Sequence, residues 1–222
     1  MQVNQCTNWQ DRANLWVNDP FLSANDQKTL KNLLSDHSPQ THQLLEEMFF
    51  QELEFGTAGL RGIVGLGSNR MNIYNIKRAT HALALTIKDH KKTSSPKPVV
   101  AISCDSRLSS EEFSQAAAEV LCAHGIETYL VTRPTATPIL SFAVRQLQCI
   151  AGIMVTASHN PKEYNGYKVY WSDGAQITAP VDKSIMEYYR GTTNLSSIPH
   201  YKAELHQAWK NMPESIYESY YQ

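Results

Sequence analysis

The sequence lacks any apolar run of the roughly 18 to 20 residues that a membrane-spanning helix requires. Its first residues, Met1 to Arg12, are polar and include Asp11, so they do not resemble a secretory leader. From these two absences we expect a cytoplasmic protein that has no membrane partner.

A surplus of one charge sign is also missing, because 20 basic and 21 acidic residues leave a formal net charge of -1. This balance gives no overall electric field that would attract nucleic acid. Cysteine is scarce, and the four cysteines lie far apart without a C-x-x-C pair. We expect them to be buried thiols rather than disulfides or zinc ligands, because three of them sit inside apolar segments.

Apolar side chains recur at helical spacing through residues 1–50, which predicts an N-terminal helical extension. Asn25-Asp26 and Ser38-Pro39 are predicted to separate its short helices. A longer amphipathic helix is predicted from Ile73 to about His90, where apolar residues recur three or four positions apart.

Further along the chain, short apolar runs alternate with helical patterns. Strands are predicted over residues 99–103, 126–131, 150–155 and 166–171, and helices over residues 109–123, 137–146 and 181–190. The run Ser109-Ser110-Glu111-Glu112 fits a capping box at a helix start. Alternation of this kind predicts an α/β fold, a three-layer α/β/α arrangement with a mostly parallel mixed sheet, preceded by the helical extension.

The run Thr156-Ala157-Ser158-His159-Asn160-Pro161 directly follows one of the predicted buried strands, and Asn165-Gly166-Tyr167-Lys168 comes soon after. A hydroxyl, an imidazole, a carboxamide and a primary amine therefore fall within thirteen residues. Ligands bind beyond the carboxyl ends of strands in open α/β sheets, so the position suits chemistry. The Asn165-Gly166 pair is predicted to turn the chain and return the Lys168 amine toward Ser158.

Two other interpretations of this run exist when it is taken alone. Serine and asparagine side chains also stabilise plain strand-to-loop turns, and this alternative fits the run about equally well. A serine hydrolase is disfavoured, because no G-x-S-x-G elbow surrounds Ser158 and adjacent residues such as Ser158 and His159 rarely aim at each other.

A second motif, Phe55-Gly56-Thr57-Ala58-Gly59-Leu60-Arg61-Gly62, supports the chemical interpretation. Its three glycines let the backbone approach an anion closely, and the planar fork of Arg61 suits phosphate oxygens. Together the two motifs resemble the active-serine loop, T-A-S-H-N-P followed by N-G-x-K, and the arginine-bearing loop of the α-D-phosphohexomutases, the phosphoglucomutases and phosphomannomutases. The resemblance extends from about Phe55 to Asp182.

The resemblance implies roles for individual residues. Ser158 would carry the phosphoryl group, Lys168 would act as acid/base or charge stabiliser, and His159 would join them in catalysis. Phosphate or substrate would be bound by Arg61, Thr57, Gly59, Asn160 and Arg107. For the Asp105/Arg107 pair a structural role is an equal alternative. Ala58 stands where relatives often have serine, which leaves Arg61 undisturbed.

The resemblance also implies the domain organisation. Residues 51–195 would form the first of four domains, and residues 196–222 would lead into a truncated second domain. In relatives Mg²⁺ is held by a phosphate oxygen on the active serine, here Ser158, together with an aspartate cluster of the second domain. This sequence has no D-x-D-x-D run, so we expect the chain alone to bind Mg²⁺ weakly.

The expected activity is that of a phosphosugar mutase of the phosphoglucomutase or phosphopentomutase-like branch. It would move phosphate between C1 and C6 of glucose, or C1 and C5 of a pentose, through a phosphoserine and a bisphosphate intermediate. Its partner would be a small-molecule phosphosugar, with Mg²⁺ as cofactor and glucose 1,6-bisphosphate as activator. The alternative is a non-catalytic remnant or phosphate-binding module of the same fold. The sequence predicts no oligomeric state.

Overall fold

The computed structural model describes residues 8–55, 59–90, 97–200 and 208–222. Six strands form one sheet within these residues, in the order β1-β5-β4-β2-β3-β6. The strands are Leu60–Ile63 (β1), Val99–Cys104 (β2), Glu127–Leu130 (β3), Ala151–Val155 (β4), Tyr164–Trp171 (β5) and Lys210–Asn211 (β6). β2 runs parallel to β3 and β4, and β6 runs parallel to β3, whereas β5 is antiparallel to both β4 and β1. The predicted mostly parallel mixed sheet is confirmed.

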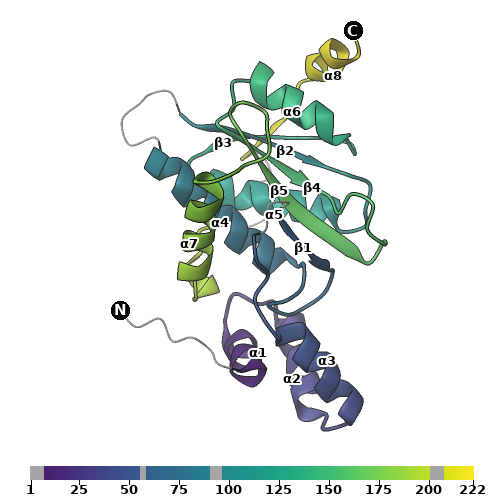
Figure 1. The fold of residues 1–222 in the computed structure, drawn as a ribbon. Helices are drawn as coiled ribbons and strands as arrows, with labels where there is room; N and C mark the ends of the chain where they lie inside the picture. Colours follow the sequence, from purple (N-terminus) through teal and green to yellow (C-terminus); the bar gives the residue numbers. More distant parts are fainter. Residues whose placement is uncertain (1–7, 56–58, 91–96, 201–207) are drawn as a thin grey trace.

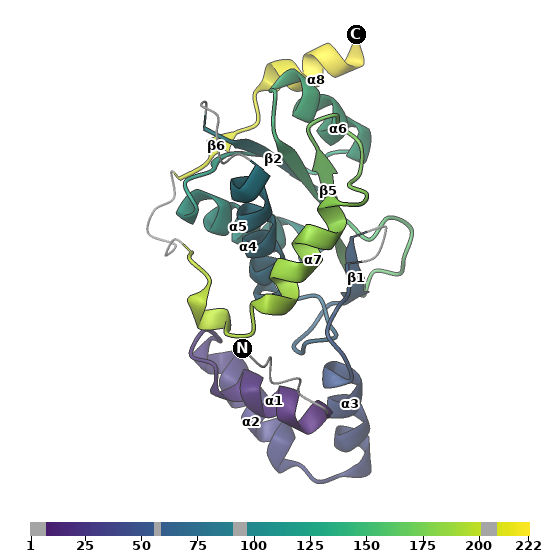
Figure 2. The same ribbon diagram turned by 60° about the vertical axis from the view of Figure 1, so that its left-hand side comes forward.

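Helices cover both faces of the sheet (Figures 1 and 2). They are Ile73–His90 (α4), Ser110–Ala123 (α5), Thr137–Gln146 (α6), Val181–Gly191 (α7) and Glu214–Tyr221 (α8). One core cluster joins α4, α5 and α7 to the sheet through side chains such as Leu83, Ile102 and Ile153. A second cluster joins α6 and α8 to the opposite face through Leu140, Met154 and Ile216. The three-layer α/β/α arrangement is therefore as predicted.

Three helices precede the sheet: Trp9–Asn18 (α1), Ala24–Ser35 (α2) and Pro39–Phe49 (α3). The predicted break at Ser38-Pro39 is confirmed, because the Ser38 hydroxyl accepts a hydrogen bond from the Thr41 N–H and Pro39 opens the helix. The predicted break at Asn25-Asp26 is wrong. These residues lie in the first turn of α2, where the Ser23 hydroxyl caps the Asp26 N–H at 3.1 Å.

The start of α5 also differs from the prediction of a capping box. Ser109 occupies the N-cap position but makes no side-chain capping hydrogen bond. Its backbone, at φ -95° and ψ -1°, is helical, whereas a capping residue usually has extended backbone that lets its side chain reach back. The next residue, Ser110, donates its hydroxyl to Asp105 at 2.6 Å, so this serine serves the loop that follows β2.

The N-terminal helices have a core of their own that extends onto the α/β layers. Trp16 and Phe49 pack there with Tyr74 of α4, and Leu195 of a short 3-10 helix, Leu195–Ser197, joins them. None of the described helices is long and apolar enough to cross a lipid bilayer. Three of the four cysteines lie in described residues; all three are buried free thiols, as expected: Cys104, Cys122 and Cys149.

Candidate active site

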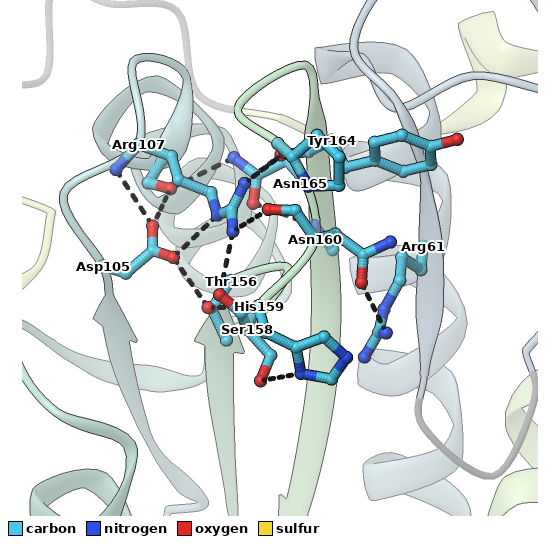
Figure 3. Close-up of polar contacts among 12 residues, drawn as sticks. Arg61, Asp105, Arg107, Thr156, Ser158, His159, Asn160, Tyr164 and Asn165 are labelled. Carbon is cyan, nitrogen blue, oxygen red and sulfur yellow. Dashed lines mark hydrogen bonds and ion pairs between the residues drawn. The ribbon is translucent and has the colours of Figure 1, made fainter.

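The run 156–161 leaves the carboxyl end of β4 as a tight loop that exposes Ser158. Ser158 has φ +58°, in the left-handed region that a residue with a side chain rarely adopts. Its N–H donates to the Thr156 hydroxyl at 2.9 Å, and the Asn160 N–H closes the turn on the Ala157 carbonyl at 3.1 Å. The Ser158 Oγ lies 3.4 Å from Nδ1 of His159 and is presented to solvent (Figure 3).

Asp105 lies beside this loop and joins several of the hydrogen bonds that support it (Figure 3). It follows β2, whose last residue pairs with the last residue of β4, so Asp105 and Thr156 leave the same sheet edge side by side. Its Oδ2 accepts hydrogen bonds from the Thr156 hydroxyl at 2.7 Å and from Nε of Arg107 at 3.0 Å. Its Oδ1 accepts from the Arg107 main-chain N–H and from Ser110, which in turn accepts a bond from buried Asn165.

All five N–H groups of the Arg107 guanidinium are hydrogen-bonded within the protein. Nε donates to Asp105, and the other four N–H groups face main-chain carbonyl oxygens of the serine loop at 2.8 to 2.9 Å. These oxygens belong to Ser158, Asn160, Pro161 and Tyr164. A guanidinium has five N–H donors, so none is left for a phosphate in this arrangement. The geometry thus differs from the phosphate-binding role expected for Arg107.

Two cationic residues flank the loop from the sheet. Arg61 of β1 pairs with Gly166 of β5, two residues before Lys168, so Arg61 and Lys168 project from the same face. Nη1 of Arg61 donates to the Asn160 side-chain oxygen at 2.9 Å (Figure 3). Burial lowers the pKa of Lys168, the positive charge of Arg61 lowers it further, and the Asp105 carboxylate opposes both effects.

The chain reversal that brings Lys168 back is located differently from the prediction. β5 begins at Tyr164, so the Asn165-Gly166 pair lies inside the strand, and the turn occupies the loop before it. Gly166 is required there by close packing, because an added Cβ would lie 2.6 Å from the Thr156 carbonyl oxygen and 2.9 Å from that of Leu60. The predicted turn at Asn165-Gly166 is therefore wrong, whereas the return of the chain beside β4 is present.

Gly59 meets the same kind of constraint. It has φ +84°, and an added Cβ would lie 2.1 Å from the Tyr167 carbonyl oxygen of the neighbouring strand. Gly59 therefore packs against β5, whereas from the sequence we expected it to lie against a bound anion. Thr57 lies outside the described residues. Of the expected site residues, the structure brings Arg61, Ser158, His159 and Asn160 together, and Arg107 holds them from beneath.

The described residues do not by themselves fit a Mg²⁺ site. Nowhere in residues 8–55, 59–90, 97–200 and 208–222 do three or more His, Cys, Asp or Glu side chains gather closely enough to hold a metal ion. The nearest carboxylate to the loop, that of Asp105, has both oxygens engaged by hydrogen bonds. Because Mg²⁺ demands six oxygen ligands, no chemical step can be derived through it from these residues.

We did not infer from the sequence that Thr156, Ser110 and Asn165 support the serine loop, as all three do. The sequence carried one signal of this support, which is the position of polar residues directly after buried strands. Polar residues that directly follow two buried parallel strands meet at one sheet edge, and Asp105 and Thr156 do so. The contact of Ser110 with Asn165 joins residues 55 positions apart, which no local pattern indicates.

Comparison with known proteins gives one consistent family. A sequence model described as phosphoglucomutase/phosphomannomutase, alpha/beta/alpha domain I, matches residues 52–196. A phosphoglucomutase of Staphylococcus haemolyticus is 42% identical over 191 residues, covering 84% of this chain and 34% of the relative. A phosphoglucomutase of Staphylococcus epidermidis is 38% identical over 203 residues, covering 90% and 36%. The chain thus spans about a third of the length of these relatives.

Solved structures agree in fold. A structure assigned as a phosphomannomutase from Thermus thermophilus superposes with a TM-score of 0.64 at 25% identity, covering 77% of this chain and 35% of that one. A phosphoglucomutase/phosphomannomutase family protein from Burkholderia thailandensis gives a TM-score of 0.52 at 20% identity, covering 70% and 32%.

Proposed function

Because this chain belongs to the phosphoglucomutase/phosphomannomutase family and matches its domain I, we propose that it supplies the phosphoserine loop of a phosphosugar mutase. The observation that carries the proposal is Ser158, an exposed serine at φ +58° in the loop after β4, with Arg61 bonded to Asn160 of the same loop and Lys168 on the adjacent strand β5. A nucleophile on a strained turn, with cations beside it, suits phosphoryl transfer.

The reaction divides into two transfers. Phosphorylated Ser158 gives its phosphoryl group to a free sugar hydroxyl: the Oγ–P bond breaks, a sugar O–P bond forms, and the hydroxyl proton passes to a base. The Ser158 oxygen then attacks the other phosphate of the resulting bisphosphate, and the released sugar oxygen regains a proton. Lys168 suits this proton exchange, because its lowered pKa brings its neutral form closer to working pH.

The neighbours of Ser158 would stabilise the negative charge of its phosphate. A phosphoserine carries about -1.5 to -2 charges near neutral pH and needs donors and cations close by. Among the described residues, the bond of Arg61 to Asn160 uses one of its five N–H groups, which leaves the others for phosphate oxygens. His159, next to Ser158 and exposed, would supply a further donor.

The relatives' name supports glucose phosphates as substrates, with transfer between C1 and C6, and a pentose with transfer between C1 and C5 is the alternative. Glucose 1,6-bisphosphate would serve as activator by phosphorylating Ser158. Mg²⁺, which phosphoglucomutases generally use, would be held chiefly by an aspartate cluster in a further domain of a longer protein and would meet Ser158 only through its phosphate.

The test is the intact mass of the purified chain before and after incubation with glucose 1,6-bisphosphate and Mg²⁺. We expect a gain of one phosphoryl group, lost in Ser158→Ala and kept in Ser172→Ala, which removes an exposed hydroxyl in the turn after β5. A gain that persists in Ser158→Ala would overturn the role of Ser158. No gain in any variant would show that the metal and a further domain are needed even for this first transfer, and would leave the alternative of a phosphate-binding module standing.

A further inference from the structure

Arg107 and Asp105 have more contacts with the serine loop than a substrate-binding pair needs. We infer that they are positioning residues that hold the loop 156–161 in the one conformation that presents Ser158, and that Arg107 does not bind phosphate. This inference rests on the proposed role of Ser158 as the phosphoryl carrier. Neither residue touches the reacting oxygen, so both act through the loop backbone.

The first argument is the number and convergence of the contacts. Four main-chain carbonyl oxygens from residues 158–164 point at one guanidinium, within 2.8 to 2.9 Å of its nitrogens. The Arg107 side chain is 15% exposed, so water competes poorly for these bonds. A loop whose carbonyls converge on a single, partly buried cation has little freedom to rearrange, because any shift breaks several charge-assisted bonds together.

The second argument is the link from Asp105 to the backbone of Ser158. The Asp105 carboxylate fixes the Thr156 hydroxyl by accepting its hydrogen bond, which turns a lone pair of the hydroxyl oxygen toward the Ser158 N–H. With the Ser158 N–H held by Thr156 and the Ser158 carbonyl held by Arg107, the backbone on both sides of its Cα is fixed at φ +58°, a value that serine does not favour by itself. Asp105 thus joins the guanidinium beneath the loop to the strained residue at its tip.

The third argument separates positioning from phosphate binding. A phosphate could reach Arg107 only by displacing Asp105 or one of the four carbonyls, because all five donors are engaged. Arg61, by contrast, keeps most of its donors among the described residues. The two arginines that the sequence placed in one class therefore separate into a phosphate ligand and a scaffold.

Substitution by lysine distinguishes these roles for Arg107. Lysine keeps the positive charge that a phosphate ligand needs but cannot reproduce a planar set of five donors. A matched pair at Thr156 tests the other half of the network: Thr156→Ser keeps the hydroxyl, and Thr156→Val removes it with little change in volume. Arg133→Lys serves as control, since Arg133 lies in the next loop, where it pairs with Glu214.

Hydrogen exchange of the whole chain, followed by mass spectrometry of the peptide spanning residues 156–164, gives the first readout. We expect exchange about tenfold faster in Arg107→Lys and in Thr156→Val, and unchanged in Thr156→Ser and Arg133→Lys. Circular dichroism and thermal unfolding establish that each variant folds. If Arg107→Lys does not fold, the Thr156 pair decides the question. Unchanged exchange in folded Arg107→Lys, or in Thr156→Val, would overturn the inference.

The rate of Ser158 phosphorylation at increasing glucose 1,6-bisphosphate gives the second readout. Positioning predicts a maximal rate about 100-fold lower in Arg107→Lys with an unchanged half-saturating concentration, because misplacement of about 1 Å costs that much. A raised half-saturating concentration at unchanged maximal rate would identify a phosphate ligand and overturn the inference. If the unsubstituted chain takes up no phosphoryl group, that result concerns the proposed function alone, and the exchange experiment still decides the positioning role.

Discussion

Ser158 concentrates the local strain of the site in one residue. A left-handed backbone brings the Cβ of an L-residue close to the following carbonyl oxygen, which disfavours it by about 1 to 2 kcal/mol. Of the described non-glycine residues, Ser158 and Gln148 alone have positive φ. Strain of this kind persists where the surrounding structure over-determines it, and the bonds of Arg107, Asp105 and Thr156 do so here.

The strain can be measured without reference to activity, because Ser158→Gly and Ser158→Ala both remove the hydroxyl. Glycine adopts φ +58° freely, whereas alanine keeps the Cβ. We expect Ser158→Gly to exceed Ser158→Ala by about 1 kcal/mol in free energy of unfolding, measured by urea denaturation. At Ser184, inside α7, the order should reverse by about 1 kcal/mol, because glycine is the poorer helix former. An alanine variant at position 158 as stable as the glycine variant would argue against strain.

The sequence was enough to predict that residues of the two motifs lie together, but not which role each residue has. Ser158, Asn160 and Arg61 meet as the two motifs indicated. Arg107 lies outside the two motifs and was assigned to phosphate by the family resemblance, with a structural role as the equal alternative. Which oxygens its guanidinium contacts depends on the path of the loop, and that path is fixed by contacts over 50 residues apart in sequence.

At the level of helices and strands, hydrophobic periodicity was sufficient to predict where the long helices and the buried strands lie in the sequence. The observed bounds of α4 and α6 agree with the predicted ranges. The predictions were wrong where a tertiary contact overrides a local signal. Asn165-Gly166 has the composition of a turn but lies in β5, and its glycine is needed there because the backbone on either side comes too close for a side chain. Asn25-Asp26 likewise has the composition of a break, but the Ser23 cap places it inside α2.

The packing of α4 against α5 includes a titratable pair that predicts acid sensitivity. Nδ1 of His81 lies 2.9 Å from Nε2 of His124, whose Nδ1 lies 2.9 Å from the Lys88 ammonium. Burial, then the charge of Lys88, lowers the pKa of His124 to about 4, and burial also lowers that of His81. The unfolded chain takes up these protons first, near pH 6.5, so stability is intact above about pH 6.5 and declines toward about pH 4.

Replacing His124 should remove much of this acid-dependent loss. Between about pH 7.5 and about pH 5, we expect the free energy of unfolding to fall by about 1 kcal/mol more in the unsubstituted chain than in His124→Asn, a value reduced for the partial exposure of His124. Asparagine is chosen because it keeps a polar side chain that does not titrate. Urea denaturation at both pH values measures it, with exposed His37→Asn as control. Parallel pH curves for the unsubstituted and His124→Asn chains would contradict the prediction.

At the scale of the whole molecule, the N-terminal helices and the α/β layers share a hydrophobic cluster. Trp16 lies in α1, and the centroid of its ring is 6.0 Å from that of Tyr74 in α4. Leu195 and Ile198, from the segment after α7, belong to the same cluster. The Asp19 carboxylate accepts the Leu195 N–H at 3.1 Å and the Ser196 hydroxyl at 2.6 Å. Residues 8–50 therefore share one core with residues of α4, α5 and the segment after α7.

This shared cluster predicts that the helical extension unfolds together with the sheet. In a variant that keeps Trp16 and carries phenylalanine at the other three tryptophans, the urea transition seen by fluorescence should coincide with that seen by far-ultraviolet circular dichroism. The same coincidence is expected in a variant that keeps only Trp171, which lies in β5 and contacts the main sheet core. An extension that formed an independent unit would lose Trp16 fluorescence at lower urea than the circular dichroism signal. Such a separation would show that the contacts of Tyr74, Leu195 and Asp19 are too weak to couple the two parts, and that the division at residue 50 is a boundary of stability as well as of sequence pattern.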